Sequence, residues 1–378
     1  MKRHESTAGL WTGCRVGLLT RAVWTLALTL IGGPLHAQWQ IENSGTTADL
    51  RGIDSVGGGV AWASGTNGTV LRTEDGGYMW QPCAIPPDAA KLDFRGVQAF
   101  DANTAIVMSS GPGDQSRLYK TTDGCQTWKL VFTNPDKDGF WDAILLNRYD
   151  KDGYLVGDPV GGSFRYWTTD DKGATWQGDW QGADGKRTAW RGLAAYPGEG
   201  AFAASNSALL VDERYAIGFV TGGPAGGRLF LSDDMKDGSR FHAVNLPLCT
   251  GSATCGAYSI ESRDYDGLIV VGGDYQKPND SKGTAAYSRN GGESWRASQT
   301  PPHGYRSAVA YDAALKTWIT VGPNGTDIST DDGKNWRAVH PDAALHEALD
   351  ADRNWNTLSL PYVVGPKGRI GKLDRSSF

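Results

Sequence analysis

One eight-residue pattern recurs along this chain: a serine or threonine, an aspartate two positions later, a glycine, and a tryptophan at the eighth position. Its first copy is Thr73-Glu-Asp75-Gly-Gly77-Tyr-Met-Trp80. The later copies are marked by Asp123 with Trp128, Asp171 with Trp176, a degenerate copy at Asp234 that ends in Phe241, Asn290 with Trp295, and Asp331 with Trp336. Successive copies start 41 to 63 residues apart, which is about the size of one propeller blade.

The chemistry of the pattern is structural. A short hydroxyl and a carboxylate can both bond neighbouring backbone N–H groups while glycine adopts a positive φ, and together they close a tight turn. The tryptophan then places a large ring between neighbouring sheets. Six copies of one turn are better explained as folding devices than as catalytic aspartates.

An alternating strand, a second strand that ends in glycine and a glycine-rich turn precede each copy. Seven such inner strands are predicted, at residues 50–53, 94–97, 141–144, 202–204, 258–260, 305–308 and 346–349. The seventh unit stops near Leu373 without its tryptophan, whereas Trp39 has no pattern before it. The sequence therefore predicts an all-β, seven-bladed β-propeller of four-stranded antiparallel blades, closed by the N-terminal strand completing the last blade.

Residues 1–37 resemble a signal peptide. Lys2, Arg3, Arg15 and Arg21 supply positive charge, an apolar stretch covers residues 22–31, and Ala37 ends a small-residue cleavage site. The apolar stretch is shorter than the roughly 20 residues that cross a bilayer. We therefore expect an exported, periplasmic or extracellular protein whose single domain, residues 38–378, is not membrane-spanning after leader removal.

Loss of the leader would leave 33 basic and 41 acidic residues, a net charge of −8, which excludes nucleic acid as a partner. Four cysteines would remain. Cys249 and Cys255 are the disulfide candidate, whereas Cys83 and Cys125 lie in different repeats and stay open between pairing and free thiols. No cysteine or histidine spacing indicates a metal site, and no cofactor motif is present.

The repeated turn resembles the Asp-box, or BNR, repeat of the sialidase-like superfamily. The seven-unit cadence resembles the photosystem II stability/assembly factor family and its exported bacterial relatives, with segments such as Gly157-Asp-Pro-Val160 and Val271-Gly-Gly-Asp274-Tyr275. The resemblance implies a non-catalytic, monomeric propeller that holds a protein or peptide partner through arginines on adjacent blades.

A binding site is expected where the inner strands enter the ring, because turns of the same face gather there. The aligned inner strands place Arg306, Glu347, Arg51, Arg95 and Asp142 at one entry position of consecutive blades. This arc is interpreted either as an anion clamp or as internal salt bridges. Second-rank candidates on the same face are Asp158, Glu199, Asp274 and Tyr275.

Catalysis is the alternative hypothesis. The chain has no nucleophile elbow, zinc-protease motif or phosphate-binding loop, so no catalytic residue can be named. A glycoside hydrolase needs only two carboxyl groups at a suitable separation, and an acidic chain can supply them on the same face. The sequence therefore favours a binding protein, with a sialidase-like glycosidase acting on carbohydrate as the second hypothesis.

Overall fold

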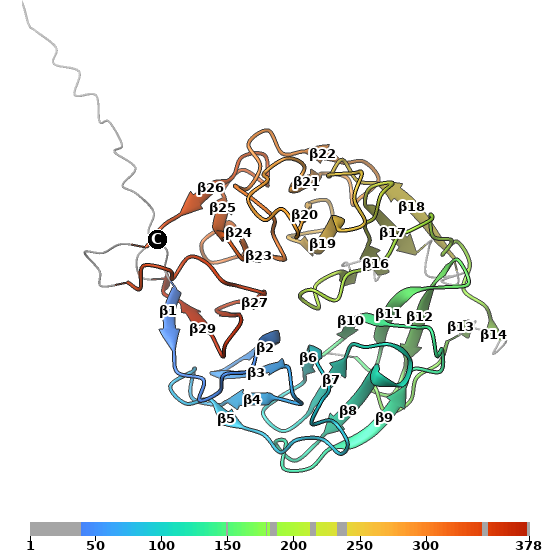
Figure 1. Ribbon diagram of the computed structural model, residues 1–378, viewed down its shortest axis with the longest axis vertical. Helices are drawn as coiled ribbons and strands as arrows, with labels where there is room; N and C mark the ends of the chain where they lie inside the picture. The colour runs from blue at the N-terminus through green and yellow to red at the C-terminus, as the bar shows by residue number, and fades with distance from the viewer. Residues whose placement is uncertain are drawn as a thin grey trace, which may run out of the picture. The chain divides into compact units, whose positions relative to one another are not determined.

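The computed structural model describes residues 39–148, 150–178, 180–181, 187–211, 217–232, 240–341 and 347–375. The predicted leader and Asp234 lie outside these residues. The described residues form antiparallel sheets arranged as the blades of a ring (Figure 1). Within these ranges no helix is long and apolar enough to cross a membrane.

Each blade runs outward from its inner strand in chain order. Blade 1 contains β2 (Leu50–Gly57), β3 (Val60–Gly65), β4 (Val70–Thr73) and β5 (Gln81–Pro82). Blade 2 contains β6 (Phe94–Ala99), β7 (Ala105–Ser109), the 3-10 turn η1 (Gly113–Gln115), β8 (Arg117–Thr121) and β9 (Lys129–Thr133). Blade 3 contains β10 (Trp141–Leu146), β11 (Gly153–Val160) and β12 (Ser163–Thr169), followed by the small hairpin β13 (Trp180–Gln181) and β14 (Arg187–Thr188).

The remaining blades repeat this order. Blade 4 contains β15 (Leu209–Val211), β16 (Ile217–Val220), β17 (Arg228–Ser232) and β18 (Phe241–Asn245). Blade 5 contains β19 (Cys255–Ser262), β20 (Leu268–Asp274), β21 (Ala285–Ser288) and β22 (Arg296–Ala297). Blade 6 contains β23 (Ala308–Asp312), β24 (Thr317–Gly322), β25 (Gly325–Ser329) and β26 (Arg337–Val339). Blade 7 contains β27 (Thr357–Ser359), β28 (Tyr362–Val364), β29 (Ile370–Leu373) and β1 (Trp39–Glu42).

The two ends of the described propeller complete one sheet. Strand β1 pairs antiparallel with β29, with Trp39 opposite Leu373 and Glu42 opposite Ile370. The indole of Trp39 donates a hydrogen bond of 3.2 Å to Thr326 of blade 6. The predicted seven-bladed fold and its closure by the N-terminal strand are therefore confirmed. In blade 3 the outer-strand position is taken by a short bridge, in which Gln177 and Thr168 exchange two backbone hydrogen bonds of 2.9 Å.

The repeated turns share one hydrogen-bond pattern in the five copies that are described. In the first copy the Thr73 hydroxyl donates to Asp75 and accepts from Gly77 N–H, and Asp75 also accepts from Met79 N–H at 3.0 Å. The same contacts recur around Asp123, Asp171, Asn290 and Asp331. Hydrogen bonds from Thr127 lower the pKa of Asp123 to about 2, so this carboxylate stays charged and fixes its turn.

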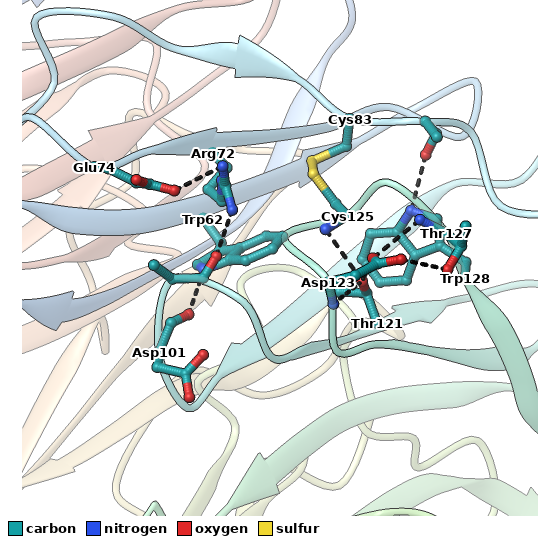
Figure 2. The surroundings of a disulfide bond; sticks show 12 residues. Trp62, Arg72, Glu74, Cys83, Asp101, Thr121, Asp123, Cys125, Thr127 and Trp128 are labelled. Atoms are coloured by element: carbon teal, nitrogen blue, oxygen red, sulfur yellow. Dashed lines mark hydrogen bonds and ion pairs between the residues drawn. A yellow bond between two sulfur atoms is a disulfide. The ribbon is translucent and has the colours of Figure 1, made fainter.

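The hydrophobic core lies between neighbouring blades, and the tryptophans of the repeated turns contribute to it. Trp80 contacts Tyr362 of blade 7 edge-on, and Trp128 contacts Trp62 of blade 1 in the same way at 6.5 Å (Figure 2). Trp176 and Trp336 are also buried against the preceding blade. Each blade is therefore joined to the one before it by a large ring.

Two disulfides reinforce the ring. Cys83 follows β5 of blade 1 and is bonded to Cys125, which lies in the repeated turn of blade 2 (Figure 2). Cys125 stands where the first copy has a glycine and adopts a left-handed φ of 62°. The second disulfide joins Cys249 to Cys255, at the start of β19. The pairing of Cys83 with Cys125, which the sequence left open, covalently links two adjacent blades.

The sequence misplaced the inner strand of blade 4. Residues 202–204 were expected to form it, but the inner strand is β15, and residues 199–208 lie before it as a separate segment. We call residues 199–208 the central segment, because it reaches into the middle of the ring (Figure 1). Its run of apolar residues at 201–204 is similar to that of a buried strand, and a short bridge between Gly200 and Gly222 continues the pairing of blade 4.

Candidate binding site at the mouth of the ring

A pocket of about 480 Å³ opens where the inner strands enter the ring. Arg51, Arg95 and Asp142 line it from the starts of β2, β6 and β10. Asp158 lines it from β11, and Tyr275 lies in the connection after β20. Five of the nine residues that the sequence singled out therefore meet in one cavity of a size usual for ligand sites, about 300–1,000 Å³.

The central segment forms one wall of this pocket and crosses the ring. Asn206 bonds both the N–H and the C=O of Ile144 in blade 3, while Ser207 donates to Ser259 in blade 5. Thr357 in blade 7 donates to the carbonyl oxygen of Ser205 at 2.8 Å. A segment that is bonded to blades on opposite sides must cross the centre of the ring, so the central segment bounds the pocket on this side.

The two arginines of the pocket share one carboxylate. Asp93 lies 2.9 Å from Nε of Arg95 and 3.6 Å from Nε of Arg51. Arg95 also donates to the carbonyl oxygen of Ala203 in the central segment. Nearly a third of each guanidinium-bearing side chain stays exposed, and Nε of Arg51 has no hydrogen-bond acceptor. This side of the pocket therefore offers forked donors and excess positive charge to an anion.

A pair of carboxyl groups, Asp142 and Asp158, lines the same pocket as the arginines. Burial raises the pKa of Asp158 to about 6, although a hydrogen bond from the N–H of Ala201 lowers this pKa. Burial and the neighbouring Asp158 raise the pKa of Asp142 well above its ordinary value, while Arg95 acts in the opposite direction. One oxygen of Asp142 is buried without a hydrogen-bond partner. Two carboxyl groups that oppose each other's ionisation titrate as a coupled pair, of which Asp158 ionises first.

Arg306 was placed in the arc wrongly. Its side chain is fully buried inside blade 6, where Nε donates to Asp327 at 2.8 Å and Nη1 donates to the carbonyl of Tyr305 at 2.7 Å. The alignment was off by one residue: the N–H of Arg306 bonds Gly272 of the preceding blade, as the N–H of Leu50 bonds Gly365. Because strand side chains alternate, a shift of one residue turns a side chain from the channel to the interior. Ser307 takes the position that was assigned to Arg306.

Glu347 was also placed wrongly. It lies in the connection that precedes blade 7, and the inner strand of that blade is β27, preceded by Trp355 and Asn356. Leu349, whose apolar side chain suggested an inner strand, is 82% exposed. In blade 7 the position equivalent to that of Arg51 is occupied by Asn356. Its side chain lines the pocket and donates to the carbonyl of Leu50.

Glu199 and Asp274 have structural partners near the pocket. Glu199 is buried and forms an ion pair with Arg228, whose guanidinium lies between the rings of Tyr196 and Phe230. Glu199 also accepts from the hydroxyl of Thr221 at 2.6 Å. Asp274 accepts from the hydroxyl of Thr254 and from the N–H of Gln276, which caps its own turn. Neither carboxylate lines the pocket.

The sequence missed the aromatic lining apart from Tyr275. Phe140, Phe202, Tyr258, Tyr305 and Trp355 line the pocket. Tyr258 could have been found from the repeat, since it occupies in blade 5 the position of Arg51 in blade 1. Phe202 could not, because the irregular central segment carries no repeat signal.

The fold and the site define a class: a closed seven-bladed β-propeller with an arginine-bearing, aromatic-lined pocket at the mouth of the ring. No protein-family model matches the chain, and no match was found among curated proteins.

Among solved structures, "YCF48 bound to D1 peptide" has a TM-score of 0.59 at 17% identity and covers 89% of this chain and 96% of that chain. YCF48 from Cyanidioschyzon merolae has a TM-score of 0.57 at 17% identity, covering 89% and 98%. The computationally designed Ika8 protein has a TM-score of 0.51 at 10% identity, covering 89% and 100%. The resemblance to the photosystem II assembly factor propellers is confirmed, and at this identity it establishes the fold alone.

Proposed function

We propose that the protein is an exported, non-catalytic propeller that holds an anionic peptide segment of a partner protein in the pocket at the mouth of the ring. The observation that carries this proposal is the pair of Arg51 and Arg95, which lie on adjacent blades, are partly exposed, and share the carboxylate of Asp93. Support for a peptide comes from YCF48, a propeller of the same fold that binds a D1 peptide. Support for export comes from the leader-like N-terminal sequence and from two disulfides, which persist in oxidising compartments.

Reversing the charge of both arginines tests the proposal. We expect Arg51→Glu with Arg95→Glu to weaken binding of a fluorescein-labelled hexaglutamate peptide by about tenfold or more, because two attractive charges become repulsive. Fluorescence anisotropy at rising salt measures the effect, and wild-type affinity should fall as salt screens the charges.

The matched control is Arg296→Glu with Arg337→Glu, which makes the same change of charge at two exposed positions of β22 and β26. This control should bind the peptide like the wild type. Equal affinity of the pocket variant and the control would contradict the proposal. A large loss of thermal stability in the pocket variant alone would show that the arginines serve the fold instead.

The carboxyl pair predicts a pH dependence of the same binding. Below pH 6 Asp158 is protonated and neutral, and above pH 6 it adds a negative charge to the pocket that Arg51 and Arg95 also line. We therefore expect the affinity for the acidic peptide to fall between pH 5.5 and 7.5. The Asp158→Asn variant should lose this dependence and keep the low-pH affinity, as measured by anisotropy across the range.

Glycoside hydrolysis is the second candidate, because the same two carboxyl groups line a pocket with aromatic walls. Asp142 is only 1% exposed, which leaves it little access to a substrate. Purified protein assayed with nitrophenyl glycosides separates the two functions. If the wild-type protein hydrolysed a nitrophenyl glycoside and Asp158→Asn did not, the proposed binding function would be wrong and a catalytic function would be supported.

A further inference from the structure

Four aromatic side chains gather on the wall of the pocket that the arginines do not form. We call Phe202, Tyr258, Tyr275 and Tyr305 the aromatic cluster. Phe202 and Tyr258 are stacked with ring centroids 4.0 Å apart, and Tyr305 meets Tyr258 edge-on at 4.8 Å. Tyr275 lies against both Tyr258 and Tyr305, at 6.3 and 6.5 Å. The four rings come from the central segment and from blades 5 and 6, so packing of neighbouring blades brings them together.

One ring of the cluster, that of Tyr275, is exposed to solvent and packs against buried rings. Tyr258 and Tyr305 are 2% and 6% exposed, whereas Tyr275 is 49% exposed. An exposed tyrosine is common on protein surfaces, but one supported by a packed base resembles the anchor of a binding interface. The hydroxyl of Tyr258 donates to the carbonyl of Thr254, which fixes the supporting ring in place.

The backbone that carries Tyr275 is held through its neighbour Asp274 by Thr254 and Cys255. Asp274 pairs with Cys255 across β20 and β19, and Cys255 is tied to Cys249 by the disulfide. Thr254 then donates to the Asp274 carboxylate at 2.6 Å. An aromatic side chain on such an ordered turn loses little freedom when it binds, which makes each contact more effective.

We propose that the aromatic cluster is a second subsite of the pocket, which takes an aromatic side chain of the partner peptide while Arg51 and Arg95 hold a carboxylate beside it. This inference rests on the proposed function and narrows the ligand to an acidic peptide that also carries an aromatic residue. The occupant follows from the two walls together: the charge of one wall selects an anion, and the rings of the other select a planar apolar group.

The test uses two labelled acidic peptides of equal charge, one with a central phenylalanine and one with alanine at that position. Wild-type protein should bind the phenylalanine peptide about tenfold more tightly, since aromatic contact adds to burial of the ring. Tyr275→Ala should bind both peptides with the affinity of the wild type for the alanine peptide. Tyr275→Phe should keep the discrimination, because the ring and not the hydroxyl makes the contact.

The control is Tyr78→Ala, which removes an exposed tyrosine outside the pocket and should leave both affinities unchanged. Equal binding of the two peptides by the wild type would overturn the aromatic subsite and leave the arginine site standing. Failure of both peptides to bind would instead overturn the proposed function. Displacement of the phenylalanine peptide by cellohexaose, lost in Tyr275→Ala, would overturn the peptide assignment in favour of a carbohydrate.

Discussion

Replacing Trp128 with alanine is expected to lower the free energy of unfolding by about 3–5 kcal/mol, the cost of deleting a large aromatic side chain from a core. Trp128 is 8% exposed, contacts Trp62 of the preceding blade, and donates through its indole to the carbonyl of Ala84 at 2.9 Å. The substitution therefore leaves a cavity between two blades and a carbonyl without its donor. The disulfide between Cys83 and Cys125 would still hold the two blades together, so we expect a less stable propeller and not an unfolded chain.

Urea unfolding followed by tryptophan fluorescence and circular dichroism measures the loss. Leu130→Ala is the matched control, because Leu130 lies on β9 of the same blade but is 44% exposed. It should cost less than about 1 kcal/mol, as surface substitutions do. Equal costs for Trp128→Ala and Leu130→Ala would show that the tryptophans of the repeated turns do not join the blades.

Glu199→Ala is expected to cost a similar amount, about 3–5 kcal/mol, because it leaves the buried guanidinium of Arg228 without its partner. The pair is nearly inaccessible, with side-chain exposures of 1% for Glu199 and 8% for Arg228. Glu199 also accepts from the N–H of Tyr196 and so fixes the beginning of the central segment. The variant should lose peptide affinity as well, since the central segment supplies the partners of Arg95, Asp142 and Asp158.

Two further variants separate stability from binding. Glu293→Ala removes an exposed glutamate and should change neither quantity. Replacing both members of the pair, Glu199→Leu with Arg228→Met, should recover much of the stability, because two apolar side chains leave no buried charge. If Glu199→Ala were as stable as the wild type, the ion pair would not anchor the central segment.

The repeat predicted the fold well because its chemistry is local. A hydroxyl, a carboxylate and a glycine within a few residues decide each turn, and the tryptophan that follows decides which sheets pack together. The closure by Trp39 was predicted because the seventh unit lacks its outer strand at the C-terminal end, whereas the N-terminal end has a strand that belongs to no unit. The turns needed no long-range contact to be predicted, and the one long-range pairing, of β1 with β29, followed from counting strands.

The site was predicted less well because it depends on register and on an irregular segment. Arg51, Arg95 and Asp142 line one pocket, as the alignment of the inner strands predicts, since their strands follow the repeat without interruption. The alignment of Arg306 was wrong by one residue. This shift was enough to turn its side chain from the channel to the interior of the blade. The burial of Glu199 could not be predicted, because its partner Arg228 lies 29 residues later, in β17, and no local sequence pattern indicates the pair.

Pairing of β1 with β29 sets an order on the assembly of the chain during synthesis. Six blades are built from strands that are close in sequence, and each can form as soon as its own strands have been made. The seventh combines the first strand of the propeller with the last three, so β1 has to wait unpaired while the other blades form. During that interval its backbone is a free sheet edge, open to pairing with a neighbouring chain. The strand that seals the finished ring is therefore also the one whose pairing partner is made last.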